Sequence, residues 1–549
     1  MRLMSLVGLI ALLFIAWLLS FDRWKVNVKP ILWGMGLQFT FALIILNQND
    51  LSFAGMALLG LLLVNFCLRK VSLGSGGAEA GQEGASRTTE AAVFSLGGLV
   101  LGTAGYYLHQ VFPVWILVGL LLSGMVINAF VVKREQIQPW LSAGFIALLV
   151  SGLIGDRLYG QDLFSKFSDG VTYFLGFSDF GAQFLFGNLA DRNHFGPADP
   201  FPGFGFQFAF VVLPTIIFFG GVMSVLYYLG IMQRIIEAMS KFMRWTIGTS
   251  GAETLSCSAN VFVGQTEAPL LIKPFLMKMT NSELLTIMVG GFATIAGGVL
   301  AGYINMGVDA GDLIAASVMS APAALVIGKI IFPESEHSET AGDVPLPKID
   351  VGDNVLEAAT SGISDGFKLA MNVGAMLIGF IALIAVLDSI LALFDGLIDG
   401  RILGGEYYDY EFTGSSPVTG EYAGWFPGSL QTFFGHVLRP LAFLMGVPWE
   451  DAPAVGNLLG VKLSLNEFVA FGSLGHYIQE GVLPERAARI ATYSLCGFAN
   501  FSSVGIQIGG LSALAPERRG DLARVGLRAM FGGALASWTT ATVAGMFMG

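Results

Sequence analysis

The chain has few charged residues. Asp, Glu, Lys and Arg make up 13% of its 549 residues, and hydrophobic residues make up 54%. A soluble domain usually carries about twice that share of charge. The charges fall in short clusters between long apolar runs, which is the pattern of a helical membrane protein rather than of a large soluble core. The composition therefore excludes a secreted or cytosolic domain.

Cysteine, histidine and basic residues are also scarce. The three cysteines, Cys67, Cys257 and Cys496, are an odd number in apolar surroundings, which indicates small buried side chains and no disulfide framework. None of the five histidines stands at ligand spacing from another histidine or cysteine, so a metal centre built on histidine is not expected. The formal charge of -11 provides no basic face for nucleic acid.

Long apolar runs are what the sequence does have, and they predict an all-α polytopic membrane protein. They lie near residues 1–20, 31–47, 52–67, 93–108, 113–132, 140–154, 207–231, 283–306, 312–332, 370–395, 433–447, 489–514 and 525–548. The first run could be a signal peptide, but no small-residue cleavage site follows it, so we expect a retained span. Several runs are shorter than the roughly 20 residues that a helix needs to cross a bilayer, which favours re-entrant or broken segments.

The loops give an orientation. Basic residues cluster in every second short loop, beginning with residues 23–29, 69–70 and 133–134. By the positive-inside rule these loops are cytoplasmic, which places Met1 outside.

Two polar segments inside apolar sequence recur in the same order. The first contains Gln265, Thr266 and Glu267, and about 25 residues later comes Gly-Phe-Ala-Thr at 291–294. The second contains Glu467, and about 31 residues later comes Gly-Phe-Ala-Asn at 497–500. An ionised carboxylate at membrane depth must face water or a partner, and broken helices survive there only where they line a cavity. Two such segments in two halves indicate a secondary transporter with its site near the bilayer midplane.

Helix packing is the alternative interpretation of these features. A lone intramembrane glutamate can serve as a hydrogen-bonding group between helices, and glycine-rich spans often mark close packing. For Gly297 and Gly298 we favour packing. Polar groups are too dense around Gln265–Glu267, and around Asn500 with Ser503, for packing alone to explain them.

At these residues the chain resembles the concentrative nucleoside transporters. The motifs that carry the resemblance are NVFVGQTEAPL at 260–270, GGFATIAGGVLAGY at 290–303, NEFVA at 466–470 and CGFANFSS at 496–503. Flanking stretches extend it over nearly everything from about residue 160 onward and over the first two runs. The resemblance implies cation-coupled nucleoside symporters that assemble as homotrimers. A scaffold there surrounds a transport core of two inverted repeats, each with a re-entrant hairpin.

The resemblance also implies a nucleoside site and a sodium site. Gln265, Thr266 and Glu267 would contact the base; Glu467, Asn500 and Ser503 would hold the ribose hydroxyls; Phe498 would pack beside the nucleoside. The sodium ligands would be Asn260, Val263, Thr294 and Ile295. Thr294 is a mild departure from members with serine at that position, and it keeps the oxygen. Sodium is the coupling ion, and no other cofactor is implied.

The expected domain organisation follows from these motifs. It comprises N-terminal scaffold spans at 1–47, inserted spans at 48–158 with a flexible linker at 71–91, an interfacial segment at 159–205, a first transport repeat at 206–332, a polar connector at 333–360 and a second repeat at 361–549. Compact bacterial members of the family lack the inserted spans, and the sequence assigns them no role.

The predicted function is sodium-coupled nucleoside uptake by an elevator-like alternating-access motion, in the lipid bilayer of a bacterial inner membrane. Three alternatives stay open. A proton-coupled nucleoside symporter would use the same fold. A carrier of another polar solute fits less well, because Glu467, Asn500 and Ser503 suit a diol. An intramembrane enzyme would need a nucleophile with a base or a metal cluster, and the spans show neither.

Overall fold

The fold is all-α, as the sequence predicts. A computed structural model describes residues 1–73, 103, 107, 114–128, 137–191, 207–342, 344, 352–405 and 424–548, and every regular element within these ranges is a helix. Seven of the described helices are long and apolar enough to cross a bilayer. Beyond residue 73, the expected linker at 71–91 lies outside the described residues. So does the apolar run at 93–108, except for residues 103 and 107, together with parts of the expected interfacial segment and polar connector.

The chain divides into two compact units. Residues 39–166 form one unit, and residues 1–38 with 167–549 form the other. The main helices of the smaller unit are α3 (Asp50–Leu73), α5 (Val114–Ile127) and α6 (Gln138–Gly155). Helix α6 packs against both α3 and α5, and Val64 and Leu68 share a buried core with Ala143 and Ala147. Two further helices, α2 (Val28–Ile45) and α7 (Gly160–Leu175), cross the boundary between the units.

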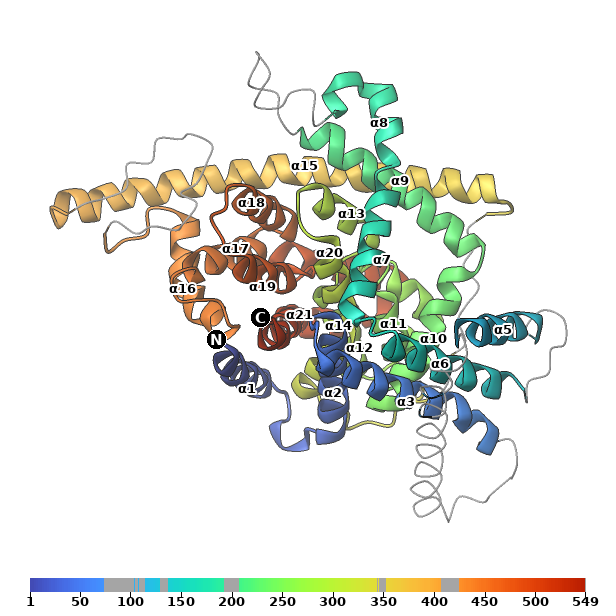
Figure 1. The fold of residues 1–549 in the computed structure, drawn as a ribbon. Helices are drawn as coiled ribbons and strands as arrows, with labels where there is room; N and C mark the ends of the chain where they lie inside the picture. Colours follow the sequence, from blue (N-terminus) through green and yellow to red (C-terminus); the bar gives the residue numbers. More distant parts are fainter. Residues whose placement is uncertain are drawn as a thin grey trace. The chain divides into compact units, whose positions relative to one another are not determined.

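The larger unit contains two series of helices with the same order of parts. The first series is α11 (Gly251–Ala259), the 3-10 segment η4 (Ala268–Lys278), α12 (Asn281–Ala293), α13 (Gly297–Asn305) and α14 (Ala310–Ile331). The second is α17 (Ala452–Ser464), α18 (Glu467–Gln479), α19 (Glu485–Leu495), α20 (Phe501–Leu514) and α21 (Arg519–Phe547). In each series two short helical segments are followed by two helices separated by a break and then by a long helix, which is the order of parts that the sequence predicts (Figure 1).

Both broken spans are interrupted at the Gly-Phe-Ala motif, and the two breaks lie back to back. Gly497 has a φ of +124°, which disfavours any residue with a Cβ atom. A Cβ atom there would stand 2.6 Å from the carbonyl oxygen of Phe292, beside the other break. In the first repeat the Gly297 N–H donates to the carbonyl of Phe262 at 3.1 Å, which joins this break to the tip of the first hairpin.

Polar side chains cap two hairpin helices and the half-helix that follows the second break. The side chain of Ser250 accepts from the backbone N–H of Glu253, whose carboxylate accepts in return, at the start of α11. Asn466 caps α18 and Asn500 caps α20, each accepting a backbone N–H three residues on. Such caps supply partners for the N–H groups that a helix start leaves free, which is essential where no water is available.

Ion pairs that are largely buried join helices within the first series and between the two series. Lys329 near the end of α14 lies 2.8 Å from Glu253 of the first hairpin and 3.1 Å from Glu334. Across the repeats, Arg489 of α19 donates to both oxygens of Asp312 on α14 at 2.9 and 3.0 Å. Pairing offsets part of the cost of burying these charges, and removing one partner would leave the other buried and uncompensated.

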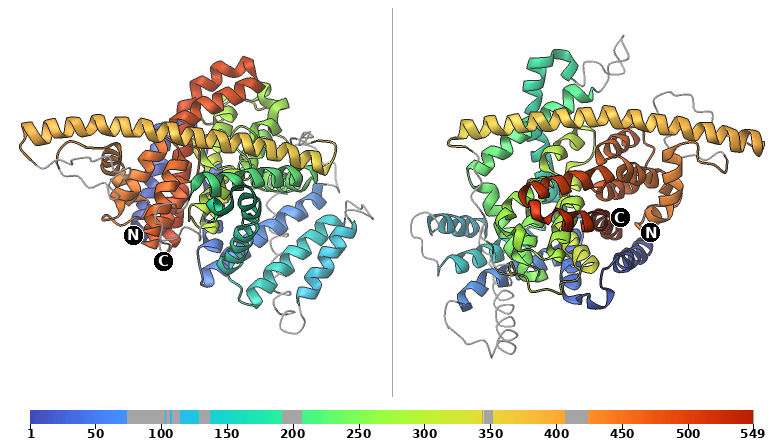
Figure 2. Two further views of the ribbon diagram at one scale, coloured as in Figure 1. Left: turned by 90° about the horizontal axis from the view of Figure 1, so that it is seen from above. Right: turned by 180° about the vertical axis from the view of Figure 1, so that it is seen from behind.

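The larger unit also contains six helices outside the two series: α1 (Arg2–Leu18), α8 (Ser178–Phe186), α9 (Phe208–Tyr228), α10 (Ile231–Ile247), α15 (Val355–Asp395) and α16 (Leu430–Leu444). With 41 residues, α15 is about 60 Å long, twice the hydrocarbon thickness of a bilayer, so it cannot stand upright with its whole length inside that layer. It is a single unbroken helix in every view (Figure 1, Figure 2). Gly362 and Gly366 let it approach the backbone of α9 at Gly220, where an added Cβ would meet backbone atoms within 3.0 Å.

Candidate functional site

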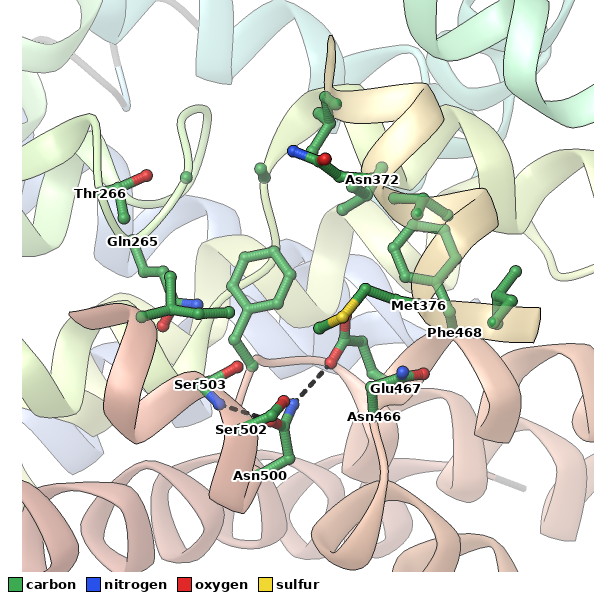
Figure 3. A pocket seen from close by; sticks show the side chains of 18 of the residues that line it. Gln265, Thr266, Asn372, Met376, Asn466, Glu467, Phe468, Asn500, Ser502 and Ser503 are labelled. Carbon is green, nitrogen blue, oxygen red and sulfur yellow. Dashed lines mark hydrogen bonds between the residues drawn. The ribbon is translucent and has the colours of Figure 1, made fainter. Parts of the chain in front are cut away.

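The two breaks, the two hairpin tips and α15 surround one cavity of about 790 Å³. The residues expected to contact a nucleoside all line it: Gln265, Thr266, Glu267, Glu467, Phe498, Asn500 and Ser503. Figure 3 shows Gln265 and Thr266 on one side, Asn466 and Glu467 on the other, and Asn500, Ser502 and Ser503 between them. Residues that are more than 200 positions apart in the sequence, such as Gln265 and Asn500, thus face the same space.

Glu467 is the buried carboxylate of this cavity. It is the first residue of α18, where the positive end of the helix dipole favours a negative charge, and its side chain is 4% exposed. One carboxylate oxygen accepts from the Asn500 side-chain amide at 3.0 Å, and the other accepts from the Tyr303 hydroxyl at 3.4 Å. These two donors orient the carboxylate and leave lone pairs free for a ligand.

Asn500 joins the two polar segments of the second repeat. Its side-chain oxygen accepts from the Ser503 N–H at 2.8 Å and from the Ser502 hydroxyl at 2.7 Å, while its amide nitrogen reaches Glu467. The same side chain therefore starts α20 and fixes the carboxylate of the second hairpin. Because its oxygen is occupied, Asn500 can offer a ligand only the remaining hydrogen of its amide.

Glu267 has a different environment. It accepts from the Gly264 N–H within the hairpin tip, and its side chain is exposed. It lines a second cavity of about 360 Å³ as well as the main one. An accessible carboxylate is what the cost of an ionised group at membrane depth requires. The neighbouring Gln265 is buried, and its side-chain oxygen has no hydrogen-bond partner.

The four expected sodium positions lie at the junction of the first hairpin tip and the first break. Asn260 is 1% exposed, and neither atom of its side-chain amide has a hydrogen-bond partner. The Thr294 hydroxyl donates to the Gly290 carbonyl at 2.9 Å, which leaves lone pairs on its oxygen. Among the described residues no backbone N–H outside the helices donates to the carbonyl of Val263 or Ile295. A buried amide oxygen, a hydroxyl and two free carbonyls are the ligand type that a hard cation prefers.

The cavity also has lining residues that sequence reasoning did not select, among them Asn372 and Met376 of α15, together with Asn466, Phe468 and Ser502. Asn372 stands in a long apolar run, and a polar residue in such a run is the signal that could have found it. Nothing in the sequence indicated that α15 would pass beside the hairpins.

No cysteine is among the residues that line the main cavity. Cys257 and Cys496 are buried free thiols, as the sequence suggested. Within the described ranges no group of histidine, cysteine and carboxylate side chains could hold a metal ion. The arrangement of two half-helix breaks and two hairpin tips around a cavity defines a secondary transporter.

Comparison with known proteins agrees with this class. Family models match residues 7–62 as the Na+ dependent nucleoside transporter N-terminus, 209–309 as nucleoside recognition, and 312–545 as the Na+ dependent nucleoside transporter C-terminus. An uncharacterized transporter of Haemophilus influenzae is 43% identical over 74% of this chain and 90% of its own length. Sodium/nucleoside cotransporter 1 of Mus musculus is 42% identical over 75% of this chain; the match spans 61% of that longer protein.

Solved structures give the same result. A structure of CNTnw in an inward-facing, substrate-bound state aligns with a TM-score of 0.70 and 31% identity, covering 100% of this chain and 98% of that one. A CNTnw variant in an outward-facing state aligns with a TM-score of 0.70 and 30% identity over 100% and 97% of the two chains. The chain belongs to the family of Na+-dependent nucleoside transporters. It is therefore an integral, multi-pass membrane transporter and no enzyme.

Proposed function

We propose that the chain is a sodium-coupled nucleoside symporter that works by alternating access. The observation that carries the proposal is the single cavity in which both glutamates, both hairpin tips and the second break meet. CNTnw has been solved in inward- and outward-facing states, which supports alternating access for a chain of this fold. Assembly as a homotrimer and residence in a bacterial inner membrane belong to the same proposal.

Glu467 and its neighbours are proposed to bind the ribose. A nucleoside is neutral, so a buried carboxylate is best used as an acceptor for the two ribose hydroxyls. Asn500 and Tyr303 already hold Glu467 in place, and Ser503 lies on the same side of the cavity. A substrate that lacks one hydroxyl would leave an acceptor unsatisfied, and deoxyribose analogues should therefore be handled less well.

The tip of the first hairpin is proposed to contact the base. Gln265 offers both a donor and an acceptor, Thr266 a hydroxyl, and Glu267 an acceptor that water can reach. Phe498 also lines the cavity and would pack against the flat face of the nucleoside. Base contacts through an exposed tip leave room for bridging water, which tolerates different bases.

Sodium is proposed to bind at Asn260, Val263, Thr294 and Ile295. The ion would bridge the first hairpin tip and the first break, the same two segments that the Gly297–Phe262 hydrogen bond already joins. Binding there would order the hairpin that carries the base-contacting residues. Ion and nucleoside binding would thus reinforce each other without direct contact.

Radiolabelled uridine uptake into liposomes with the purified protein tests the proposal. Vesicles receive an inward sodium gradient, an inward proton gradient or neither. We expect uptake above equilibrium with sodium alone. Concentrative uptake with protons alone would confirm the nucleoside as substrate and show that the coupling ion is the proton. No uptake in any condition would refute nucleoside transport. Glu467→Gln protein in the same vesicles is the control for leakage.

A further inference from the structure

Lys462 is a fully buried charge that the proposed transport site does not use. It lies in the last turn of α17, in the second hairpin, and its side chain is 0% exposed. It does not line the main cavity. An ammonium group at membrane depth is costly unless it is paired, so a lysine kept there indicates a role for its charge.

The ammonium caps the end of a broken half-helix. Its nitrogen donates to the carbonyl of Ser494 at 3.0 Å, and Ser494 belongs to the last turn of α19, just before the second break. Carbonyls in a last turn lack intrahelical donors and form the negative end of the helix dipole. Glu467 begins the next helix of the same hairpin, five residues further along the chain. One fixed cation thus stands at the carbonyl end of α19, beside the second break.

The corresponding position of the first repeat holds no charge. Cys257 stands three residues before the helix-end residue Asn260, just as Lys462 stands three residues before the helix-end residue Leu465. Cys257 is neutral and short, and its thiol lies 3.7 Å from the Thr286 carbonyl. The helix-end residues differ in the opposite sense. In the first repeat Asn260 is a buried polar amide without hydrogen-bond partners, whereas in the second Leu465 is apolar.

We propose that Lys462 is a built-in cation that does for the second repeat what the coupling sodium does for the first. Both would neutralise the carbonyl end of a broken half-helix and hold a hairpin tip against it. Ion coupling is thereby confined to the first repeat. Lys462 is a positioning residue, since it acts through Ser494 and Glu467. This inference rests on the proposed sodium site.

The first test removes the cation. Lys462→Ala is compared with Lys462→Arg and with Lys278→Ala, which removes an exposed lysine. We expect Lys462→Ala to lose at least about tenfold in uridine uptake at low sodium, as for a lost hydrogen bond to a buried charge. High sodium should partly restore uptake with a Hill coefficient above that of wild type, because an ion can enter the vacated space. Lys462→Arg should stay within about threefold of wild type, with an unchanged Hill coefficient.

Unchanged sodium dependence in Lys462→Ala, at any level of uptake, would overturn the proposal. If that variant does not assemble, a second variant tests the proposal. The double substitution Cys257→Lys with Asn260→Leu gives the first repeat the residue types that the second has at Lys462 and Leu465. Equilibrium uridine binding by this variant is measured with and without sodium. We expect binding that no longer needs sodium, and persistent sodium dependence would refute the idea. Failure of wild-type protein to take up uridine would instead refute the proposed function itself.

Discussion

The two repeats place a glutamate at corresponding points of their hairpins but give it opposite surroundings. Glu467 is 4% exposed and is held by Asn500 and Tyr303. The Glu267 side chain is exposed toward the cavities that it lines, and it accepts from the backbone of its own tip. The second hairpin is a continuous helix on each side of a short tip, whereas the first continues as a 3-10 segment after a longer one.

The different surroundings of the two glutamates show how two repeats of the same architecture can have different binding roles. A rigid, desolvated carboxylate discriminates strongly, because any hydroxyl missing from the substrate leaves it unpaired. An exposed and less regular hairpin tip discriminates weakly between bases and can adapt to different ones. The first repeat also has the orphaned Asn260 amide where the second has Leu465. These local differences suit the second repeat to binding the ribose, and the first repeat to binding the base and the ion.

The largest expected effect is at the buried glutamate. Glu467→Gln should reduce uridine uptake at least about 100-fold, because two charge-assisted acceptor positions are lost in a desolvated site. Glu267→Gln should reduce it far less, since water can replace its contacts. Uptake into liposomes measures both, and gel filtration checks that the oligomer still assembles. Wild-type uptake by Glu467→Gln would refute the proposed contact between Glu467 and the ribose.

The two Gly-Phe-Ala breaks should also respond differently. Gly497→Ala forces a side chain into a positive φ against the Phe292 backbone, and should lower the free energy of unfolding by about 2–4 kcal/mol. At the equivalent Gly291 the added methyl would meet side chains rather than backbone, namely the Gln507 amide that donates to the Met288 carbonyl and the Cβ of Gln265, so we expect a smaller loss there. Thermal unfolding in detergent compares the variants. Equal losses would show that the two breaks are equally constrained.

The half-maximal sodium concentration should respond to the sodium ligands of the first repeat and not to the matched helix-end residue of the second. Asn260→Ala or Thr294→Ala should raise the sodium concentration for half-maximal uptake by about tenfold, as expected for the loss of one oxygen ligand. The matched change at the end of the other hairpin helix, Leu465→Ala, should leave that concentration unchanged. The measurement is initial uridine uptake against sodium concentration. A constant half-maximal value in both first-repeat variants would exclude them from the ion site.

The smallest effect is expected at the first hairpin tip. Gln265→Ala and Thr266→Ala should change the ratio of cytidine to adenosine uptake by about two- to fivefold, because water can substitute for lost base contacts. Discrimination between uridine and deoxyuridine should stay as in wild type. Competition assays with the four nucleosides measure both ratios together. Equal loss for every substrate would argue against contact with the base.

Much of the site could be predicted before the structure was known. Polar and helix-breaking residues inside apolar runs are costly, so Gln265–Glu267 and Asn500 with Ser503 stood out from their surroundings. The repeat was visible because both halves break a span with the same Gly-Phe-Ala motif. Asn372 was not selected, since a single asparagine in a long helix is also compatible with packing.

The sequence by itself determined the membrane class, the helical fold, the two repeated breaks and the family, because these depend on local composition and on motifs of a few residues. Only the tertiary structure decided that the breaks lie back to back, that Glu467 is buried while Glu267 is exposed, and that Lys462 donates to the Ser494 carbonyl. The physical reason is that burial and hydrogen-bond partners arise from segments far apart in the chain, and no local pattern specifies which of them will meet.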